Sequence, residues 1–90
     1  MSGYTFRHWS ISADMLEAIQ RYVDHGIGPG NFLSAVICND LADAVGRADD
    51  VNIENLPAYV AYFWNECPST CWGSVDKMKN WIASHGEDKP

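Results

Sequence analysis

Hydrophobic residues recur along most of the chain at spacings of three and four, which is the period of an α-helix. A first run predicts a helix near residues 13–25. Its apolar positions are Met15, Ile19, Tyr22 and Val23. Asp14 and Glu17 form a capping-box pattern at the start, and Gly26 suits a left-handed C-terminal cap.

A second helix is predicted from Asn31, whose side chain can accept from free helix-start amides, to near Gly46. The turn Ile27-Gly28-Pro29-Gly30 separates it from the first. Its apolar positions are Phe32, Leu33, Val36, Ile37, Leu41, Ala44 and Val45, broken by Asn39 and Asp40. This stripe is wider than one partner helix covers, so we expect it to pack against a neighbour or a second copy of the chain.

Two further helices are expected in the second half. Residues 47–55 are polar and indicate a loop or a frayed helix start. Pro57 is tolerated only in a first turn, so a third helix should begin near Asn55 and end at Cys67 and Pro68. One side of it would carry Leu56, Val60, Phe63 and Trp64. After a compact turn over 68–73, Ser74 can cap a last helix that Gly86 stops. Its apolar positions are Val75, Met78, Trp81 and Ile82.

No segment shows a clear strand signal, so the predicted fold class is all-α: a small bundle of about four helices. We expect an N-terminal arm over 1–12, a single helical domain over 13–86 and a polar tail over 87–90. A chain of 90 residues buries a modest share of its surface, which makes an oligomer plausible.

The net charge limits the classes of binding partner that we expect. Six Lys and Arg residues against 12 Asp and Glu residues give a net charge of −6, with no basic run. A broad footprint for DNA or an anionic membrane is therefore not expected. The sequence has no run of about 18 apolar residues and no signal-peptide pattern, so cytoplasmic residence is expected.

Candidate catalytic and metal chemistry is sparse. Cys38, Cys67 and Cys71 are interpreted as reduced thiols. Cys67 and Cys71 with His85 or His25 make a weak zinc pattern, so no metal or cofactor is expected. No nucleophile elbow, His-Glu-x-x-His pair or phosphate-binding loop occurs, and the chain is predicted not to be an enzyme.

Three features suggest ligand binding, each beside a structural alternative. Gly28-Pro29-Gly30-Asn31-Phe32 is either a tight turn or a place where an anion approaches the backbone. Trp72, in Cys71-Trp72-Gly73-Ser74, is either a core residue or a stacking platform for a flat base. Arg47 either complements a helix dipole or pairs with a phosphate.

The aromatic content also bears on binding. Four Trp and four Tyr residues are more than so small a core can hide, so some should face a partner chain or a planar ligand.

Several motifs occur in an order that resembles a known family. They are Arg21 to Leu33 with its Gly-Pro-Gly turn, Ala35-Val36, Asn39-Asp40-Leu41, Gly46-Arg47-Ala48-Asp49, Trp64-Asn65-Glu66 and Cys71-Trp72-Gly73-Ser74. Over roughly residues 12–82 this combination resembles the anti-CBASS sponges of tailed bacteriophages. Members of that family bind the cyclic oligonucleotide messengers of bacterial immunity without cleaving them.

The resemblance implies a helical homohexamer in which cyclic dinucleotides, of the cyclic GMP-AMP type, and cyclic trinucleotides, of the cyclic tri-AMP type, occupy separate intersubunit pockets. The implied ligand-binding residues are Gly28, Pro29, Gly30, Asn31, Phe32, Ala35, Ser69 and Thr70. Better studied members carry a tyrosine before the first helix and a lysine in the turn, where this chain has Ala13 and Gly28. This departure weakens the expectation of dinucleotide binding more than that of trinucleotide binding.

Two other function classes remain open from the residues alone. The surplus aromatics fit a protein-interaction module whose glycine turn is only structural. A DNA-binding helical repressor is less consistent with the acidic balance.

Overall fold

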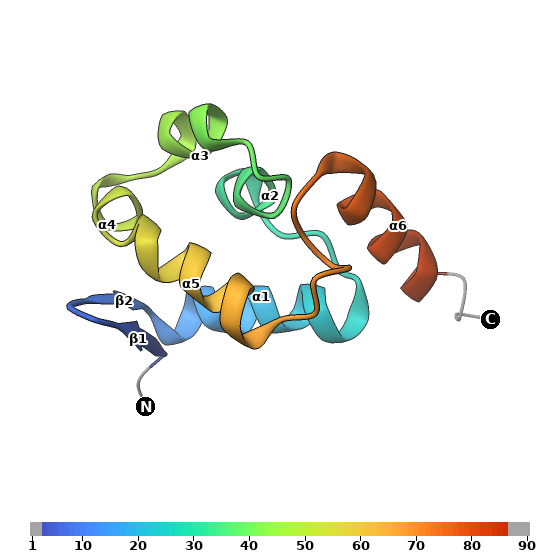
Figure 1. Cartoon of the computed structure of the whole chain (residues 1–90), viewed down its shortest axis with the longest axis horizontal. Helices are drawn as coiled ribbons and strands as arrows, with labels where there is room; N and C mark the ends of the chain where they lie inside the picture. Colours follow the sequence, from blue (N-terminus) through green and yellow to red (C-terminus); the bar gives the residue numbers. More distant parts are fainter. Residues whose placement is uncertain (1–2, 87–90) are drawn as a thin grey trace.

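The computed structural model describes residues 3–86, so the polar tail predicted over 87–90 and the first two residues of the predicted arm lie outside it. Within the described range the chain forms a two-stranded hairpin followed by six helices (Figure 1). These are β1 Tyr4–Phe6, β2 Trp9–Ile11, α1 Ala13–His25, α2 Asn31–Ile37, α3 Leu41–Arg47, α4 Asp50–Glu54, α5 Leu56–Glu66 and α6 Val75–Gly86. The mostly helical prediction is confirmed, but the expected four helices are six.

The N-terminal hairpin corrects the purely all-α prediction. β1 and β2 pair antiparallel with Tyr4 opposite Ile11 and Phe6 opposite Trp9, and Arg7 adopts a φ of 55° in the connecting turn. Aromatic and β-branched side chains favour a pleated, half-buried surface, and both strands pack against α5. The alternating apolar positions of residues 4–6 and 9–11 were the available signal for these strands.

Helix α1 has the predicted bounds but a different cap. The Met15 N–H donates to the Ser12 hydroxyl oxygen over 3.3 Å, so Ser12 is the N-cap. The capping box expected from Asp14 and Glu17 is not formed. Gly26 ends the helix as predicted, with a φ of 68° and its N–H donating to the Tyr22 carbonyl over 2.9 Å.

The predicted second helix is two helices, α2 and α3. Asn39 takes a φ of 60°, its N–H donates to the Val36 carbonyl over 3.0 Å, and the Asp40 N–H donates to the Ala35 carbonyl over 2.9 Å. This is a Schellman ending, in which a left-handed residue closes the helix. Asp40 then caps α3, because its carboxylate accepts from the Asp43 N–H over 3.1 Å.

The region around α5 differs from the prediction in one element. The polar segment 47–55 contains the short helix α4, whose cap Asp49 accepts from the Asn52 N–H over 2.8 Å. The start of α5 agrees with the prediction, with a proline in its first turn. The expected apolar side is only partly buried, because Phe63 is in the core whereas Val60 and Trp64 are exposed.

The core lies between α1, α2, α5 and the hairpin. Its fully buried large side chains are Tyr22, Tyr59, Phe63, Ile11, Ile19, Ile37 and Cys71. The C-terminal helix α6 joins α1 at one end of the molecule (Figure 1). There the Trp81 indole N–H donates to the Tyr22 carbonyl over 3.0 Å. None of the helices described over residues 3–86 is long and apolar enough to cross a membrane.

Candidate functional site

A hollow lined by two indoles lies where the end of α5, the 68–73 turn and the start of α6 meet. We call it the tryptophan groove; its volume is about 310 Å³. Its lining residues are Asn39, Trp64, Cys67, Ser69, Trp72, Gly73 and Lys77. Lys77 is the one charged side chain among these lining residues, and the groove is therefore locally cationic on an acidic protein.

Two long-range hydrogen bonds hold the 68–73 turn in place. The Gly73 N–H donates to the Ile37 carbonyl at the end of α2 over 2.7 Å. The buried Tyr22 hydroxyl donates to the Cys71 carbonyl over 2.7 Å. Both bonds fix backbone on either side of Trp72, so the indole is presented by a rigid support rather than a free loop.

The two indoles of the groove differ in exposure. Trp72 is half-buried and packs on Phe63 with ring centroids 5.6 Å apart, so it is a core residue on one side and a groove wall on the other. Trp64 is 76% exposed and meets Trp72 edge to face, with centroids 6.4 Å apart and an interplanar angle of 83°. One broad aromatic face is therefore left open to a flat ligand.

A lysine and a polar turn stand beside these indoles. The Lys77 ammonium donates to the Ser69 carbonyl over 3.1 Å and keeps two further donors for an anion. Its backbone N–H donates to the Ser74 hydroxyl oxygen over 3.1 Å, which caps α6 as the sequence predicts. An aromatic surface beside an ammonium matches the two parts of a nucleotide, the base and the phosphate.

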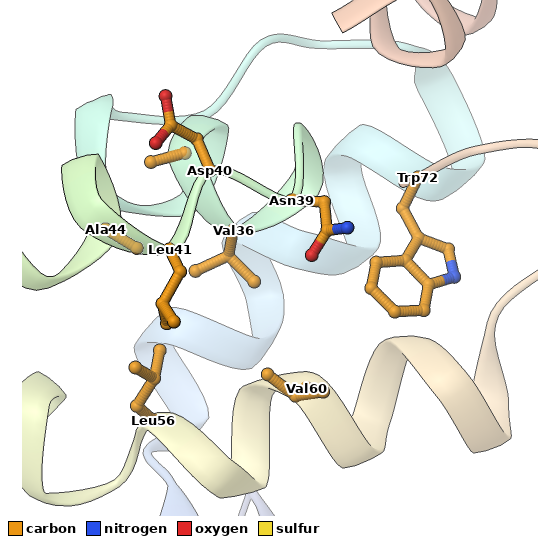
Figure 2. A pocket seen from close by; sticks show the side chains of 9 residues that line it. Val36, Asn39, Asp40, Leu41, Ala44, Leu56, Val60 and Trp72 are labelled. Atoms are coloured by element: carbon orange, nitrogen blue, oxygen red, sulfur yellow. The ribbon is translucent and has the colours of Figure 1, made fainter. Parts of the chain in front are cut away.

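A second hollow, smaller and more apolar, adjoins the first. We call it the α3–α5 groove; its volume is about 40 Å³. Its lining residues are Ala35, Val36, Asn39, Asp40, Leu41, Ala44, Leu56, Val60 and Trp72. Figure 2 shows Leu41 and Leu56 pointing toward one another across it. Asn39 and Trp72 belong to both grooves and separate them.

The structure brings some predicted site residues together. Trp72 lines both grooves, Ser69 lines the tryptophan groove, and Ala35 lines the α3–α5 groove. Thr70 is exposed next to Ser69 in the same turn. These residues come from segments more than thirty positions apart, and the contact between Gly73 and Ile37 joins them.

The Gly-Pro-Gly turn lies apart from both grooves, since none of residues 28–32 lines either one. Gly28, Gly30 and Asn31 are exposed, and the Pro29 carbonyl accepts from the Ser34 hydroxyl over 3.3 Å. Asn31 is not the cap that the sequence suggested, because Gly30 occupies that position without a side-chain hydrogen bond.

Phe32 faces the core. Its ring meets Tyr59 edge to face with centroids 5.1 Å apart, and only 7% of the residue is exposed. Its side chain therefore serves packing within one chain.

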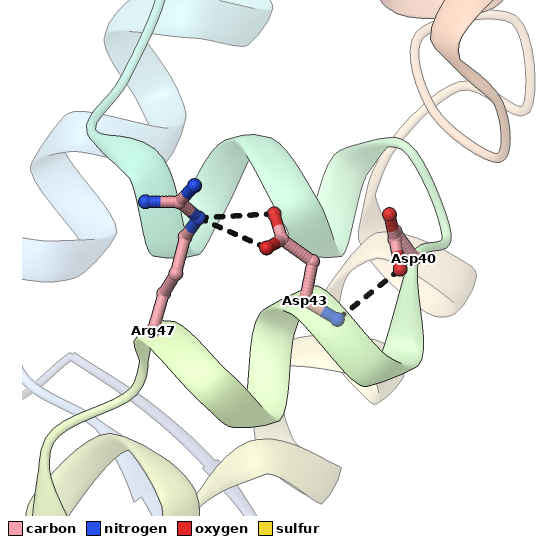
Figure 3. Close-up of polar contacts among 3 residues, drawn as sticks. All are labelled: Asp40, Asp43 and Arg47. Carbon is pink, nitrogen blue, oxygen red and sulfur yellow. Dashed lines mark hydrogen bonds and ion pairs between the residues drawn. The ribbon is translucent and has the colours of Figure 1, made fainter.

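Arg47 is engaged within its own helix. Its Nε donates to the Asp43 carboxylate oxygens over 3.0 and 3.1 Å, in the last turn of α3 (Figure 3). The two side chains are 49% and 46% exposed, so the pair is weak and a competing anion has access to the guanidinium.

All three cysteines are free thiols. A hydrogen bond from Cys67 to the Cys71 sulfur, together with burial, raises the pKa of Cys67. The groove-lining Cys67 is thus held as a neutral thiol rather than a nucleophilic thiolate. Within the described part of the chain, no group of three or more His, Cys, Asp or Glu side chains is placed to hold a metal ion.

Sequence reasoning missed Trp64, Asn39 and Lys77 as groove residues. The apolar pattern predicts Trp64 only as part of the same helix side as Leu56, Val60 and Phe63. These apolar residues form one continuous stripe on α5, whose Tyr59 and Phe63 edge is buried and whose Val60 and Trp64 edge is exposed, so spacing alone gave no signal that Trp64 would be free.

Comparison with known proteins found no match: no protein-family model, no curated protein and no solved structure is similar to this chain.

Proposed function

We propose that this chain sequesters cyclic oligonucleotide second messengers, cyclic di- or trinucleotides, without cleaving them. In this proposal it acts as a phage anti-immune protein in the cytoplasm of the infected bacterium and assembles as a homo-oligomer, a hexamer by the family resemblance. The motif order described above supports the family, and the tryptophan groove supports the ligand chemistry.

The observation that carries the proposal is the juxtaposition of the exposed Trp64 indole with Lys77. A base stacked on an aromatic side chain contributes about 1–3 kcal/mol to binding, and this contribution is tolerant of base identity. An ammonium within the same groove can pair with the phosphate that follows the base. Neither contact is specific to a transition state, so the arrangement favours binding over catalysis.

The size of the groove limits what one chain holds. At about 310 Å³ it stands at the small end of small-molecule sites, which span roughly 300–1,000 Å³. It accommodates one base and its phosphate rather than a whole cyclic di- or trinucleotide. The proposal therefore assigns the rest of the ring to a neighbouring chain.

The Gly-Pro-Gly turn is the proposed contribution of that neighbouring chain. A side chain at Gly30 would meet no atom within 4 Å, so the backbone there is open to close approach. Affinity would come from preorganisation, because a cyclic ligand and a turn fixed by hydrogen bonds lose little entropy on binding.

Calorimetric titration with cyclic tri-AMP and cyclic GMP-AMP tests the proposal. We expect saturable binding, weakened about tenfold or more in Trp64→Ala, whose side chain makes few core contacts. Lys77→Gln should weaken binding about 3- to 10-fold and reduce its salt dependence. Lys79→Gln, an exposed lysine on the same helix outside the groove, is the matched control. Absence of binding to any cyclic nucleotide removes the proposal.

A glycine pair tests the contribution of the turn. Gly30→Glu should abolish binding by bulk and charge repulsion while leaving the fold unchanged, because the position is unobstructed. Gly46→Glu adds the same charge at another unobstructed glycine and should bind normally. Light scattering of both variants reports whether assembly is retained. If both variants bind normally, the turn takes no part in the site.

A protein-interaction module is the second candidate function. The observation that favours it is a set of large apolar side chains left in water, among them Leu41 and Val51, which are 67% and 64% exposed. Such a module would retain its partner in Gly30→Glu and bind no nucleotide in the titration above.

A further inference from the structure

A further hollow lies where the β1–β2 hairpin meets the junction of α4 and α5 (Figure 1). We call it the hairpin hollow; its volume is about 320 Å³. Its lining residues are His8, Trp9, Glu54 and Asn55, none of which lines the tryptophan groove or the α3–α5 groove. Binding at the hairpin hollow is therefore independent of the proposed nucleotide site.

Hydrogen bonds join the two sides of the hairpin hollow. The Ser10 N–H donates to the Asn55 side-chain oxygen over 2.8 Å, and the Asn55 side-chain N–H donates to the Val51 carbonyl over 2.8 Å. Asn55 thus ties β2 to α4, and its side-chain oxygen keeps one lone pair for a further donor. On the hairpin side, the His8 ring lies against the Trp9 indole with centroids 4.0 Å apart. The hollow is therefore formed before a ligand arrives.

The charge of the hairpin hollow favours a cation. Glu54 is exposed, and the ion pairs found over residues 3–86 involve other carboxylates. The segment from Ala48 to Asp76, which contains α4 and α5, has no Lys, Arg or His. The Glu54 carboxylate is thus an acceptor that forms no ion pair within the described part of the chain, on a protein with a net charge of −6.

Trp9 supplies the second requirement of an organic cation site. An indole face attracts a cation through its quadrupole, and a planar guanidinium also stacks on it. The hairpin already contains one such contact, since the Arg7 guanidinium carbon lies 5.2 Å from the centre of the Phe6 ring. A guanidinium also carries five N–H donors, which match a carboxylate and an amide oxygen better than a compact ammonium does.

We infer that the hairpin hollow binds a guanidinium group. The planar cation stacks on the Trp9 indole, and its N–H groups donate to the Glu54 carboxylate and to the Asn55 side-chain oxygen. An arginine side chain of another protein and a free guanidino compound both carry this chemistry, and the experiment below distinguishes the two sources.

The test titrates the protein with N-acetyl-argininamide and follows the Trp9 indole N–H signal by two-dimensional NMR, with that signal assigned from its absence in Trp9→Phe. We expect saturable shifts with a Kd of about 1–10 mM. N-acetyl-citrullinamide, which has a similar shape but no charge, should give no saturable shift. N-acetyl-lysinamide should bind about threefold more weakly or less tightly still, because an ammonium does not stack as a plane.

Matched variants locate the site. Glu54→Gln should weaken binding about fivefold or more, whereas Glu66→Gln, the same change at an exposed glutamate outside the hollow, should stay within about twofold. Trp9→Leu should weaken binding about 3- to 10-fold, and Trp9→Phe, which keeps an aromatic face, should weaken it less. Trp64→Ala should bind normally, because it alters only the tryptophan groove. Circular dichroism establishes that each variant is folded, and Glu54→Gln decides the test if a Trp9 variant is not.

Two further probes identify the source of the guanidinium. Tighter binding of a capped Gly-Arg-Gly peptide than of methylguanidine assigns the hollow to an arginine of a partner protein, and equal or weaker binding assigns it to a free compound. Three outcomes overturn the inference: no saturable shift of the Trp9 signal up to about 50 mM N-acetyl-argininamide, equal binding of the citrulline analogue, or equal weakening by Glu54→Gln and Glu66→Gln.

Discussion

The two sides of helix α5 have similar composition but different environments. Its inner side, with Tyr59 and Phe63, is sealed against the hairpin and α2 and is at most 1% exposed. Its outer side carries Val60 and Trp64, which are 44% and 76% exposed. Apolar character alone therefore does not distinguish side chains that hold this fold together from those left exposed to solvent. The distinction depends on which neighbours the chain brings to each side.

The polar contacts differ between the two regions as well. The sealed region is tied by hydrogen bonds that span long sequence distances, such as Tyr22 to Cys71. Burial raises the pKa of Tyr22 well above its ordinary value, and raises that of Tyr59 to about 12 with a further contribution from Asp49. The open side is held by local contacts, such as the Asp43 and Arg47 pair four residues apart.

The largest expected contrast lies between adjacent residues of α5. Phe63→Ala should lower the free energy of unfolding by about 3–5 kcal/mol, because it leaves a cavity in the core. Trp64→Ala should change it by no more than about 0.5 kcal/mol, because the side chain is mostly in water. Urea denaturation measures both. Equal losses would contradict the assignment of inner and outer sides.

A pair of glycines gives the next contrast. Gly26→Ala should destabilise by about 1–3 kcal/mol, because the residue has a φ of 68° and its new Cβ would lie 2.5 Å from the His85 Cβ. Gly30→Ala should be neutral or stabilising by up to about 1 kcal/mol, because its φ is −68° and the site is unobstructed. Thermal unfolding of the two variants measures the difference, and a loss in Gly30→Ala would mean that the turn is packed.

Alkaline pH tests the buried side of α5 through the ionisation of Tyr59. The folded protein keeps Tyr59 neutral up to a pKa of about 12, whereas the unfolded chain ionises it near 10. Stability should therefore be unaffected by this group below pH 10 and fall as the pH rises from 10 to 12. Tyr59→Phe should cost about 1 kcal/mol at neutral pH, through the lost 2.8 Å bond to Asn52. Between pH 10 and 12 the urea midpoint of Tyr59→Phe should fall less steeply than that of the unsubstituted protein. An unchanged slope would mean that another group causes the loss of stability.

The smallest expected effect is at Arg47. Arg47→Gln should cost about 0.3–0.5 kcal/mol in low salt and nothing measurable in high salt, because the pair with Asp43 is half-exposed. Arg21→Gln, which breaks the exposed pair with Glu17, should behave in the same way. A larger loss of nucleotide affinity in Arg47→Gln than in Arg21→Gln would then assign the guanidinium to the ligand.

Local sequence signals predicted the elements well where the chain decides its own structure. The bounds of α1, the proline-led start of α5 and the Ser74 cap of α6 all follow from backbone chemistry within a few residues. The end of α2 at Asn39 was missed, because apolar positions continue at helical spacing into α3. The two helices are separated by the left-handed conformation of Asn39 and by the Asp40 cap.

The site was less predictable because it depends on distant contacts. Trp72 was singled out from its turn motif and Ser69 through the family resemblance, but their position beside Asn39 follows from the bond between Gly73 and Ile37. Which side of α5 is buried is likewise decided by the hairpin, whose short strands carry little signal of their own. Phe32 and Ala35 were chosen as ligand contacts, yet both are almost fully buried within one chain.

The most direct measurement of sequestration is equilibrium dialysis of the protein against cyclic tri-AMP, followed by denaturation and mass analysis of the released nucleotide. We expect the nucleotide to accumulate on the side of the membrane that holds the protein and to be recovered as the intact cyclic molecule. With the Trp64→Ala variant, this accumulation should be lost. Equal concentrations on both sides, or recovery of a linear product, would contradict it.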